Sequence, residues 1–118
     1  MKIREDSFGL SEEVVYNLSM TFESVTGVNE VVIFGSRAKG NYSEGSDIDL
    51  AVKGSDITLD TILEIKIKIE DLGLLYKVDI QNYHTIRDKD VVDHIDRAGK
   101  LIWKRNGSGQ ALRREKTS

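Results

Sequence analysis

The sequence contains no cysteine and no proline in its 118 residues. The absence of cysteine excludes disulfide bonds and thiolate metal sites, and it leaves the redox compartment open. Without proline, the ten glycines become the main markers of turns and of the ends of helices and strands. No apolar run approaches the length of a membrane span, and the opening MKIREDSFGL contains no signal-peptide hydrophobic segment. We therefore expect a cytoplasmic protein with no membrane contact.

The chain also has little excess charge, with 17 basic and 20 acidic residues and a formal net charge of -3. Proteins that coat nucleic acid neutralise phosphates with surplus lysine and arginine, so direct nucleic acid binding is not expected. The length suits one domain with a buried core. We place this domain at residues 1–105 and expect the basic, sparsely apolar segment 106–118 to be a flexible tail.

The hydrophobic pattern predicts helices that alternate with short strands. Ser11 can cap a first helix whose apolar stripe continues toward Gly27. The other predicted elements are strands at 30–34, 47–53, 74–81 and 100–104 and helices at 59–72 and 88–98. The centre of the second helix reads IKIKI, which leaves a strand there as an alternative. This order predicts an α/β (α+β) fold, with helices packed on a small mixed sheet.

Paired acids end the segment GSRAKGNYSEGSDIDL, residues 35–50. Residues two apart in a strand point to the same face, so Asp47 and Asp49 should project together while Ile48 faces the core. Such a pair favours Mg²⁺, which needs few protein ligands and completes its coordination with water and phosphate oxygens. If the third strand lies beside the pair, Asp79 adds a third carboxylate. Three acids on adjacent strands suit a two-metal site for displacement at phosphorus.

Glycine, serine and two cations begin the same segment. Gly35 allows the backbone to come close to a phosphate, and the Ser36 hydroxyl and the amides after it can donate to phosphate oxygens. Arg37 and Lys39 add positive charge, either as contacts to a triphosphate or as ordinary surface residues. Gly35 and Gly40 have the separation of the first two P-loop glycines, but Asn41 and Tyr42 stand where that motif needs Lys and Ser or Thr. The dinucleotide-binding fingerprint fails because Arg37 occupies its second glycine position.

These features together resemble a known signature. Gly35-Ser36, a ten-residue interval, Asp47-Ile48-Asp49 and a later Asp79 are similar to the motif of the DNA polymerase β-type nucleotidyltransferase superfamily. More narrowly, the chain resembles the minimal nucleotidyltransferase (MNT) family, the antitoxin-like halves of HEPN/MNT two-gene pairs. The likeness covers roughly residues 11–104 and implies the polymerase β-type nucleotidyltransferase fold.

The resemblance also implies a reaction. ATP or another nucleoside triphosphate would bind with Mg²⁺, with two ions expected and Asp47, Asp49 and Asp79 as metal ligands. Asp79 would also act as base or orienter for the attacking hydroxyl, while Gly35 and Ser36 would hold the triphosphate. The acceptor hydroxyl would attack the α-phosphorus and pyrophosphate would leave. By the same likeness, the acceptor is a tyrosine of a separate HEPN protein, whose ribonuclease activity AMP would silence.

Two other functions remain open from the sequence. One is a non-catalytic antitoxin that masks its partner by contact alone. The other is a nucleotidyltransferase for a small molecule such as an antibiotic, with a homo-oligomer building the acceptor site. The acids also have a structural interpretation as solvated residues at a strand entry, and the placement of Asp79 depends on the predicted third strand.

Overall fold

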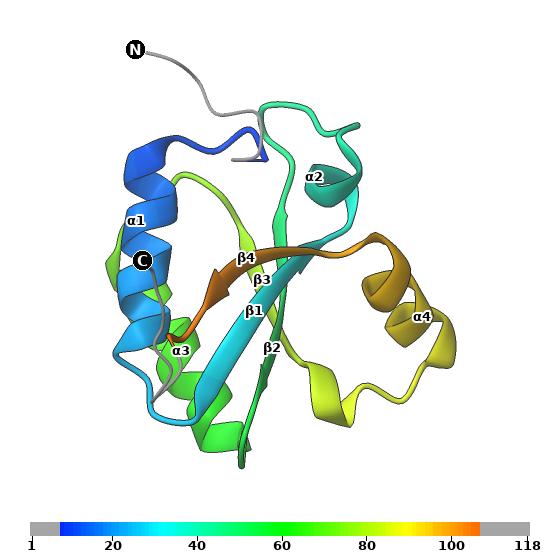
Figure 1. The fold of residues 1–118 in the computed structure, drawn as a ribbon. Coiled ribbons are helices and arrows are strands. Elements are labelled where there is room, and N and C mark those ends of the chain that lie inside the picture. Colours follow the sequence, from blue (N-terminus) through cyan, green and yellow to red (C-terminus); the bar gives the residue numbers. More distant parts are fainter. Residues whose placement is uncertain (1–7, 107–118) are drawn as a thin grey trace.

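The structure of the protein is a computed structural model in which residues 8–106 are described. Four strands form one sheet in the order β3-β2-β1-β4, with helices on both sides (Figure 1). The elements are α1 (Glu12–Glu23), β1 (Val28–Phe34), α2 (Ser36–Lys39), β2 (Ile48–Gly54), α3 (Leu59–Asp71), β3 (Val78–Asn82), the 3₁₀ helix η2 (Tyr83–Thr85), α4 (Lys89–Ala98) and β4 (Lys100–Lys104). Apart from Asn106, the predicted tail lies outside the described residues. None of the described helices is long and apolar enough to cross a membrane.

The sheet is mixed, as predicted. β1 pairs antiparallel with both β2 and β4, while β2 and β3 run parallel. The parallel pair needs a crossover connection, and α3 supplies it. Because of the register, the end of β1 and the start of β3 both lie beside the first residues of β2: Phe34 pairs with Asp49, and Asp49 pairs with Asp79.

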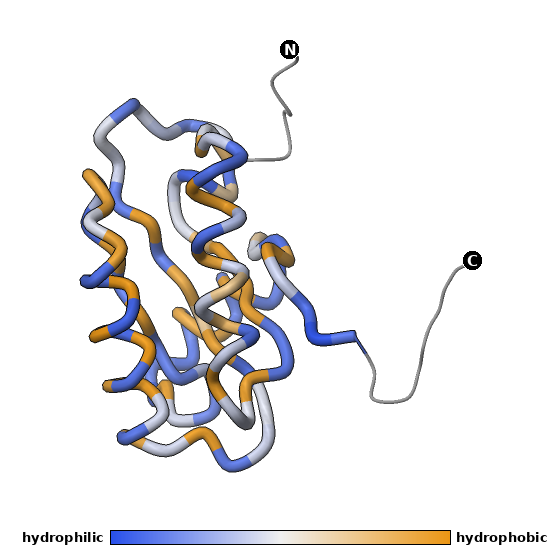
Figure 2. The backbone as a smooth tube through the Cα atoms, turned by 90° about the vertical axis from the view of Figure 1, so that its left-hand side faces the viewer, coloured by the Kyte–Doolittle hydropathy of each residue, from blue (hydrophilic) through white to orange (hydrophobic). Residues whose placement is uncertain are grey.

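The main core lies between the sheet and the layer formed by α1 and α3. Leu18, Phe22 and Ile65 from the helices are fully buried in it, against Ile48 and Leu50 of β2. Figure 2 faces this layer, and both helices carry apolar and polar positions in alternation, as amphipathic helices do. A smaller cluster on the opposite face joins α4 to the sheet through Val32, Ala51 and Ile95. That second face is therefore only partly covered.

Local signals explain where two of the helices begin. The Ser11 side chain accepts a hydrogen bond from the Val14 amide at 3.2 Å, which confirms the predicted cap of α1. Thr58 and Thr61 form a reciprocal capping box at the start of α3. The ambiguous IKIKI segment is helical: Ile65 and Ile69 are buried, whereas Ile67 is 60% exposed.

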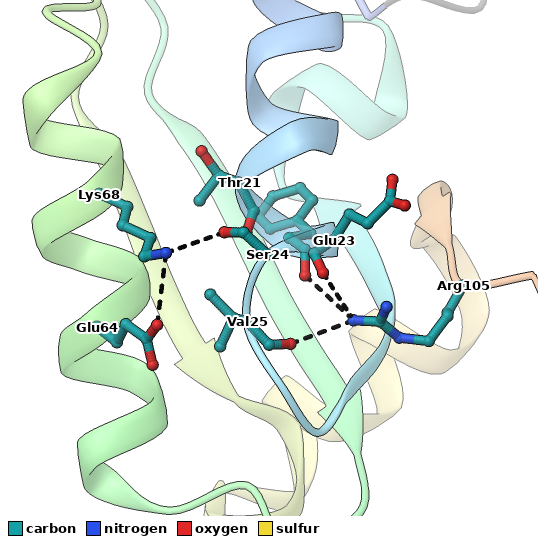
Figure 3. A network of polar contacts seen from close by, with 8 residues as sticks. Thr21, Glu23, Ser24, Val25, Glu64, Lys68 and Arg105 are labelled. Atoms are coloured by element: carbon teal, nitrogen blue, oxygen red, sulfur yellow. Dashed lines mark hydrogen bonds and ion pairs between the residues drawn. The ribbon is translucent and has the colours of Figure 1, made fainter.

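The first helix ends at Glu23, four residues before the predicted Gly27. Arg105 explains part of this, because its guanidinium donates to the carbonyl oxygens of Val25 at 3.2 Å and Val28 at 2.9 Å. On the other side of the turn, Lys68 donates to the Ser24 hydroxyl at 3.1 Å (Figure 3). Arg105 thus anchors the last strand to the end of α1, a role that the basic composition of the region did not predict.

The third strand begins at Val78, not at Leu74 as predicted. Among residues 8–106 its partner strand is β2, which starts at Ile48. Ile48 pairs with Val78 and its amide donates to the Lys77 carbonyl, so residues before Lys77 have no strand to pair with there. The helix before it, α3, ends at Asp71, and Gly73, with a φ of +68°, turns the chain away from the helix axis two residues later. Residues 74–77 therefore form an irregular segment that leads into the sheet.

Candidate active site

Two neighbouring strands bring Asp49 and Asp79 side by side. The two residues are register partners on the parallel strands β2 and β3, so their side chains leave the same face of the sheet. Ile48 and Leu50 point into the main core, which places Asp49 on the partly covered opposite face. The prediction that the third strand lies beside the acidic pair, with Asp79 next to it, is confirmed.

The electrostatics of Asp49 reflect this crowding. Partial burial raises the pKa of the Asp49 carboxyl, and the negative charges of Asp79 and Asp47 raise it further. Asp47 itself is exposed and lies just before β2, because this strand begins at Ile48, one residue later than predicted. The three acids therefore form a region of negative potential that a bound cation would relieve.

Gly35 is in direct contact with this acidic group. It precedes α2 with φ +78° and ψ -153°, a backbone conformation that is essentially restricted to glycine. A Cβ atom built at this position would lie 2.6 Å from Oδ2 of Asp49, which no side chain could tolerate without displacing the carboxylate. The glycine at the end of β1 is thus required both by the turn and by the close approach to Asp49.

The other residues of the Gly-Ser segment lie on the short helix α2. Ser36 is its first residue and is partly exposed, and Lys39 is its last residue and is exposed. Both remain accessible on the segment that follows Gly35.

Arg37 has a different environment from the one predicted. It is 2% exposed, and its guanidinium donates to three backbone carbonyl oxygens: to Phe8 at 2.9 Å, to Glu44 at 3.1 Å and to Ser46 at 3.0 and 3.1 Å. The planar fork of arginine suits several acceptors at once. With its donors directed at the backbone, Arg37 is a structural residue, and the predicted contact to a triphosphate is replaced by this role.

Two tyrosines complete the environment of Arg37. The guanidinium carbon lies 5.1 Å from the ring centroid of Tyr42 and 4.9 Å from that of Tyr76, which are cation–π distances. Arg37 therefore connects α2 to the loop before Asp47 and to the segment before β3. Nothing in the linear sequence pairs these two tyrosines with an arginine.

Gln81 is a site residue that the sequence reasoning missed. Its side-chain amide donates to Oδ2 of Asp79 at 3.1 Å. The two residues are two apart on β3, so they share a face, and that spacing was the available signal. Gln81 fixes one oxygen of the Asp79 carboxylate and leaves the other free.

Within residues 8–106, no three or more histidine, cysteine, aspartate or glutamate side chains are grouped so that they could hold a metal ion. Mg²⁺ does not require such a cage, because it usually keeps water and substrate phosphate oxygens among its ligands. Adjacent negatively charged carboxylates attract such a cation when a bound triphosphate supplies its other ligands. The donor set of Asp47, Asp49 and Asp79 is thus compatible with Mg²⁺ bound jointly by protein and nucleotide.

A comparison of sequences identifies a similar protein. A candidate protein adenylyltransferase of Methanocaldococcus jannaschii, MJ0604, is 36% identical over 42 residues, which are 36% of this chain and 41% of that protein. The chain thus aligns with less than half the length of that relative.

Two solved structures share the fold. A crystal structure of a toxin-antitoxin with AMP-PNP superposes with a TM-score of 0.62 at 23% identity, covering 81% of this chain and 75% of that chain. A crystal structure of the toxin-antitoxin MntA-HepT gives a TM-score of 0.58 at 16% identity, covering 80% and 74%. At these identities the likeness shows the fold alone.

The family comparison covers most of the sequence. Residues 17–108 match the profile described as Polymerase beta, Nucleotidyltransferase. This span includes the Gly-Ser turn, the paired acids and Asp79. The chain therefore belongs to the polymerase beta nucleotidyltransferase family.

Proposed function

We propose that this protein transfers AMP from ATP to a hydroxyl group of a partner protein and acts as the antitoxin of a toxin-antitoxin pair. The observation that carries the proposal is the pairing of Asp49 with Asp79 on adjacent parallel strands, with the Gly35 backbone against Asp49. Membership of the nucleotidyltransferase family supports the reaction class. The name of the archaeal relative and the toxin-antitoxin structures that share the fold support the acceptor and the biological setting.

The three carboxylates have distinct positions for this chemistry. We assign Asp47 and Asp49 as the ligands of Mg²⁺, with two ions expected, and Asp79 as a further ligand that faces the acceptor. Bound Mg²⁺ would neutralise the triphosphate and lower the pKa of the attacking hydroxyl. Asp79, held by Gln81, orients that hydroxyl and receives its proton.

The bond changes follow from this arrangement. The acceptor oxygen bonds to the α-phosphorus of ATP, the bond from that phosphorus to the bridging oxygen breaks, and pyrophosphate leaves. Most of the rate enhancement comes from positioning and charge neutralisation, because no covalent intermediate with the protein is required.

The segment after β1 is assigned to the triphosphate. Gly35 brings the backbone next to Asp49, and the Ser36 hydroxyl and Lys39 ammonium are accessible donors on α2. Arg37 contributes indirectly, since it holds α2 against the loop that carries Ser46 and Asp47. Its guanidinium donates to backbone carbonyl oxygens, so we assign it no contact with the triphosphate.

The acceptor assigned to this site is a tyrosine of a HEPN-family toxin. The test uses the purified protein, Mg²⁺, ATP and the product of the neighbouring reading frame, with mass spectrometry to locate any AMP on the partner. The variant Asp47→Asn/Asp49→Asn should form no adduct. The matched control is Asp88→Asn/Asp90→Asn, which changes a second Asp-x-Asp at the start of α4, where Asn also caps a helix.

The outcomes separate modification from masking. An adduct with the wild type and the α4 control, absent with the site variant, supports the proposal. Neutralisation of the toxin by the site variant, with no adduct in any sample, contradicts it and favours masking by contact.

A further inference from the structure

The free edge of β3 lies directly beside the acidic group. β3 is an outer strand of the sheet, and no other strand within residues 8–106 pairs with its second edge. The Ile48 amide donates to the Lys77 carbonyl at 2.9 Å. In a parallel pair, the backbone groups of alternate residues face the same neighbour, so those of Asp79 face β2. The N–H and C=O groups of Val78 and Ile80 therefore point outward, at the edge.

A cavity opens along the same edge. Its volume is about 340 Å³, and its lining includes Ile69 of α3, Leu74, Tyr76, and Val78, Asp79 and Ile80 of β3. Val78 and Ile80 belong to the face that packs on α3, whereas Asp79 belongs to the opposite face. Because three consecutive residues of β3 line it, the cavity runs along the strand edge and places Ile69 and Leu74 next to the residue that carries the proposed catalytic carboxylate.

One wall of this cavity is held in place by the buried arginine. The Tyr76 ring lies 4.9 Å from the guanidinium of Arg37, which is itself fixed by carbonyl oxygens of three residues. Tyr76 is thus supported by a side chain that is itself held in place. A preformed wall reduces the entropy lost when a ligand side chain enters.

We propose that the β3 edge is the docking site for the acceptor, which binds as an extended peptide segment of the partner protein and adds a fifth strand beside β3. This inference rests on the proposed function. Outward-facing backbone groups at an uncovered edge are recognised by a peptide strand, whose main-chain hydrogen bonds give affinity. Continuity between the cavity and Asp79 identifies the bound segment as the one that reacts.

Side-chain alternation then specifies the acceptor sequence. In the added strand, a residue on the Asp79 face lies one strand spacing away, about 4.8 Å, from β3. Its two neighbours point to the other face, toward Ile69 and Leu74 in the cavity. The acceptor is therefore a hydroxyl residue with an apolar residue on at least one side, in an extended segment.

The test measures docking separately from catalysis. The probe is the synthetic peptide Lys-Thr-Leu-Tyr-Leu-Thr-Lys, titrated into the ¹⁵N-labelled full-length protein and followed by NMR. We expect the amide signals of Val78 and Ile80 to shift and their hydrogen exchange to slow. Replacing both peptide leucines with alanine should weaken binding by about tenfold or more, because each leucine loses apolar contact.

Two further comparisons probe the geometry. Two peptide analogues are compared, one N-methylated at the tyrosine amide and the other at the leucine amides. Only alternate amides of an added strand face β3, so one analogue should bind about tenfold more weakly than the other. In the protein, Leu74→Ala should lower peptide affinity about fivefold, whereas Leu101→Ala on the opposite edge strand should not. The NMR spectrum of each variant reports whether it is folded.

The proposal is overturned if the peptide shifts other residues, if both N-methyl analogues bind equally, or if Val78 and Ile80 are already protected in a concentration-dependent homodimer. If AMP is transferred to the peptide equally well after the leucine-to-alanine replacements, the N-methylations and Leu74→Ala, the docking site is refuted but the transferase activity is supported. Docking at β3 with no transfer to peptide or partner would support the docking site and contradict the proposed function.

Discussion

Replacing Gly35 with alanine should damage the site more than it damages the fold. The backbone at Gly35 has φ +78° and ψ -153°, where a side chain adds strain of about 1–3 kcal/mol. In a chain of this size, each kcal/mol lowers Tm by about 4–8 °C. The added methyl group would also start 2.6 Å from Oδ2 of Asp49, so the carboxylate must move. A displacement of about 1 Å at a reacting centre can reduce the rate about 100-fold.

Gly40 offers a matched control for the strain. It also has a positive φ, +88°, but a Cβ atom there would meet no heavy atom within 4 Å. Gly40→Ala should therefore lose stability without losing activity. The assay compares AMP transfer by the two variants at a temperature where circular dichroism shows both to be folded.

Equal activity of the two variants would contradict a role for Gly35 at the site. If Gly35→Ala transfers AMP as fast as Gly40→Ala at the same folded fraction, the approach of Gly35 to Asp49 has no part in the reaction. If Gly35→Ala melts no lower than the wild type, the positive φ is not a source of strain.

Three other predictions concern charge and stability. Arg37→Ala removes a buried side chain and leaves partly buried carbonyl oxygens without a donor, so it should lower the free energy of unfolding by about 3–5 kcal/mol in urea, whereas Arg87→Ala on the surface should change it by less than about 0.5 kcal/mol. The raised pKa of Asp49 means that the folded chain binds the carboxyl proton of Asp49 more tightly than the unfolded chain does. The stability that this proton contributes is fully present below the pKa of the unfolded chain, 3.8, and is lost as pH rises through the pKa of the folded chain. Asp49→Asn should therefore raise Tm at neutral pH in the absence of divalent cations, and thermal melts across pH would show a weaker pH dependence than the wild type. A chain that ends at Asn106 should have the same Tm as the full-length protein. Arg105→Ala should lower the free energy of unfolding by about 1–3 kcal/mol, because carbonyl oxygens near the end of α1 lose their donor.

Patterns of local origin gave correct predictions for most elements. The apolar periodicity of 59–72 and the Ser11 cap are properties of neighbouring residues, and both were confirmed. The β-branched residues before Gly35 and the alternation of apolar and polar residues around Asp49 are likewise visible in short stretches of sequence. The family resemblance of the motif was confirmed by the match over residues 17–108.

Features that depend on tertiary contacts were not predictable. In the sequence, Arg37 resembles a phosphate ligand because it follows a Gly-Ser turn. In the structure it is buried, and it donates to the carbonyl oxygens of Phe8 and Ser46, which are distant in sequence. The start of β3 is set by the start of its partner β2, and the apolar Leu74 had suggested an earlier one. A short 3₁₀ helix after β3 has no sequence periodicity to reveal it.

The candidate site was predictable in part for the same reason. The spacing of Asp47 and Asp49 is local, but the position of Asp79 beside them needed a parallel pairing across α3, which the structure provides. Gln81 was missed because polar residues on an exposed strand face are common. Its contact with Asp79 becomes informative only when the carboxylate is placed next to Asp49.

The most direct test of the reaction uses ATP labelled at either the α- or the γ-phosphate, with Mg²⁺ and the partner protein. We expect the α-label to become covalently attached to the partner, the γ-label to be released as pyrophosphate, and Asp47→Asn/Asp49→Asn to abolish both. Attachment of γ-label would identify phosphoryl transfer, and failure of either label to attach to a partner that is nonetheless inhibited would identify masking; either result would contradict the assignment of Asp47, Asp49 and Asp79 as a nucleotidyltransferase site.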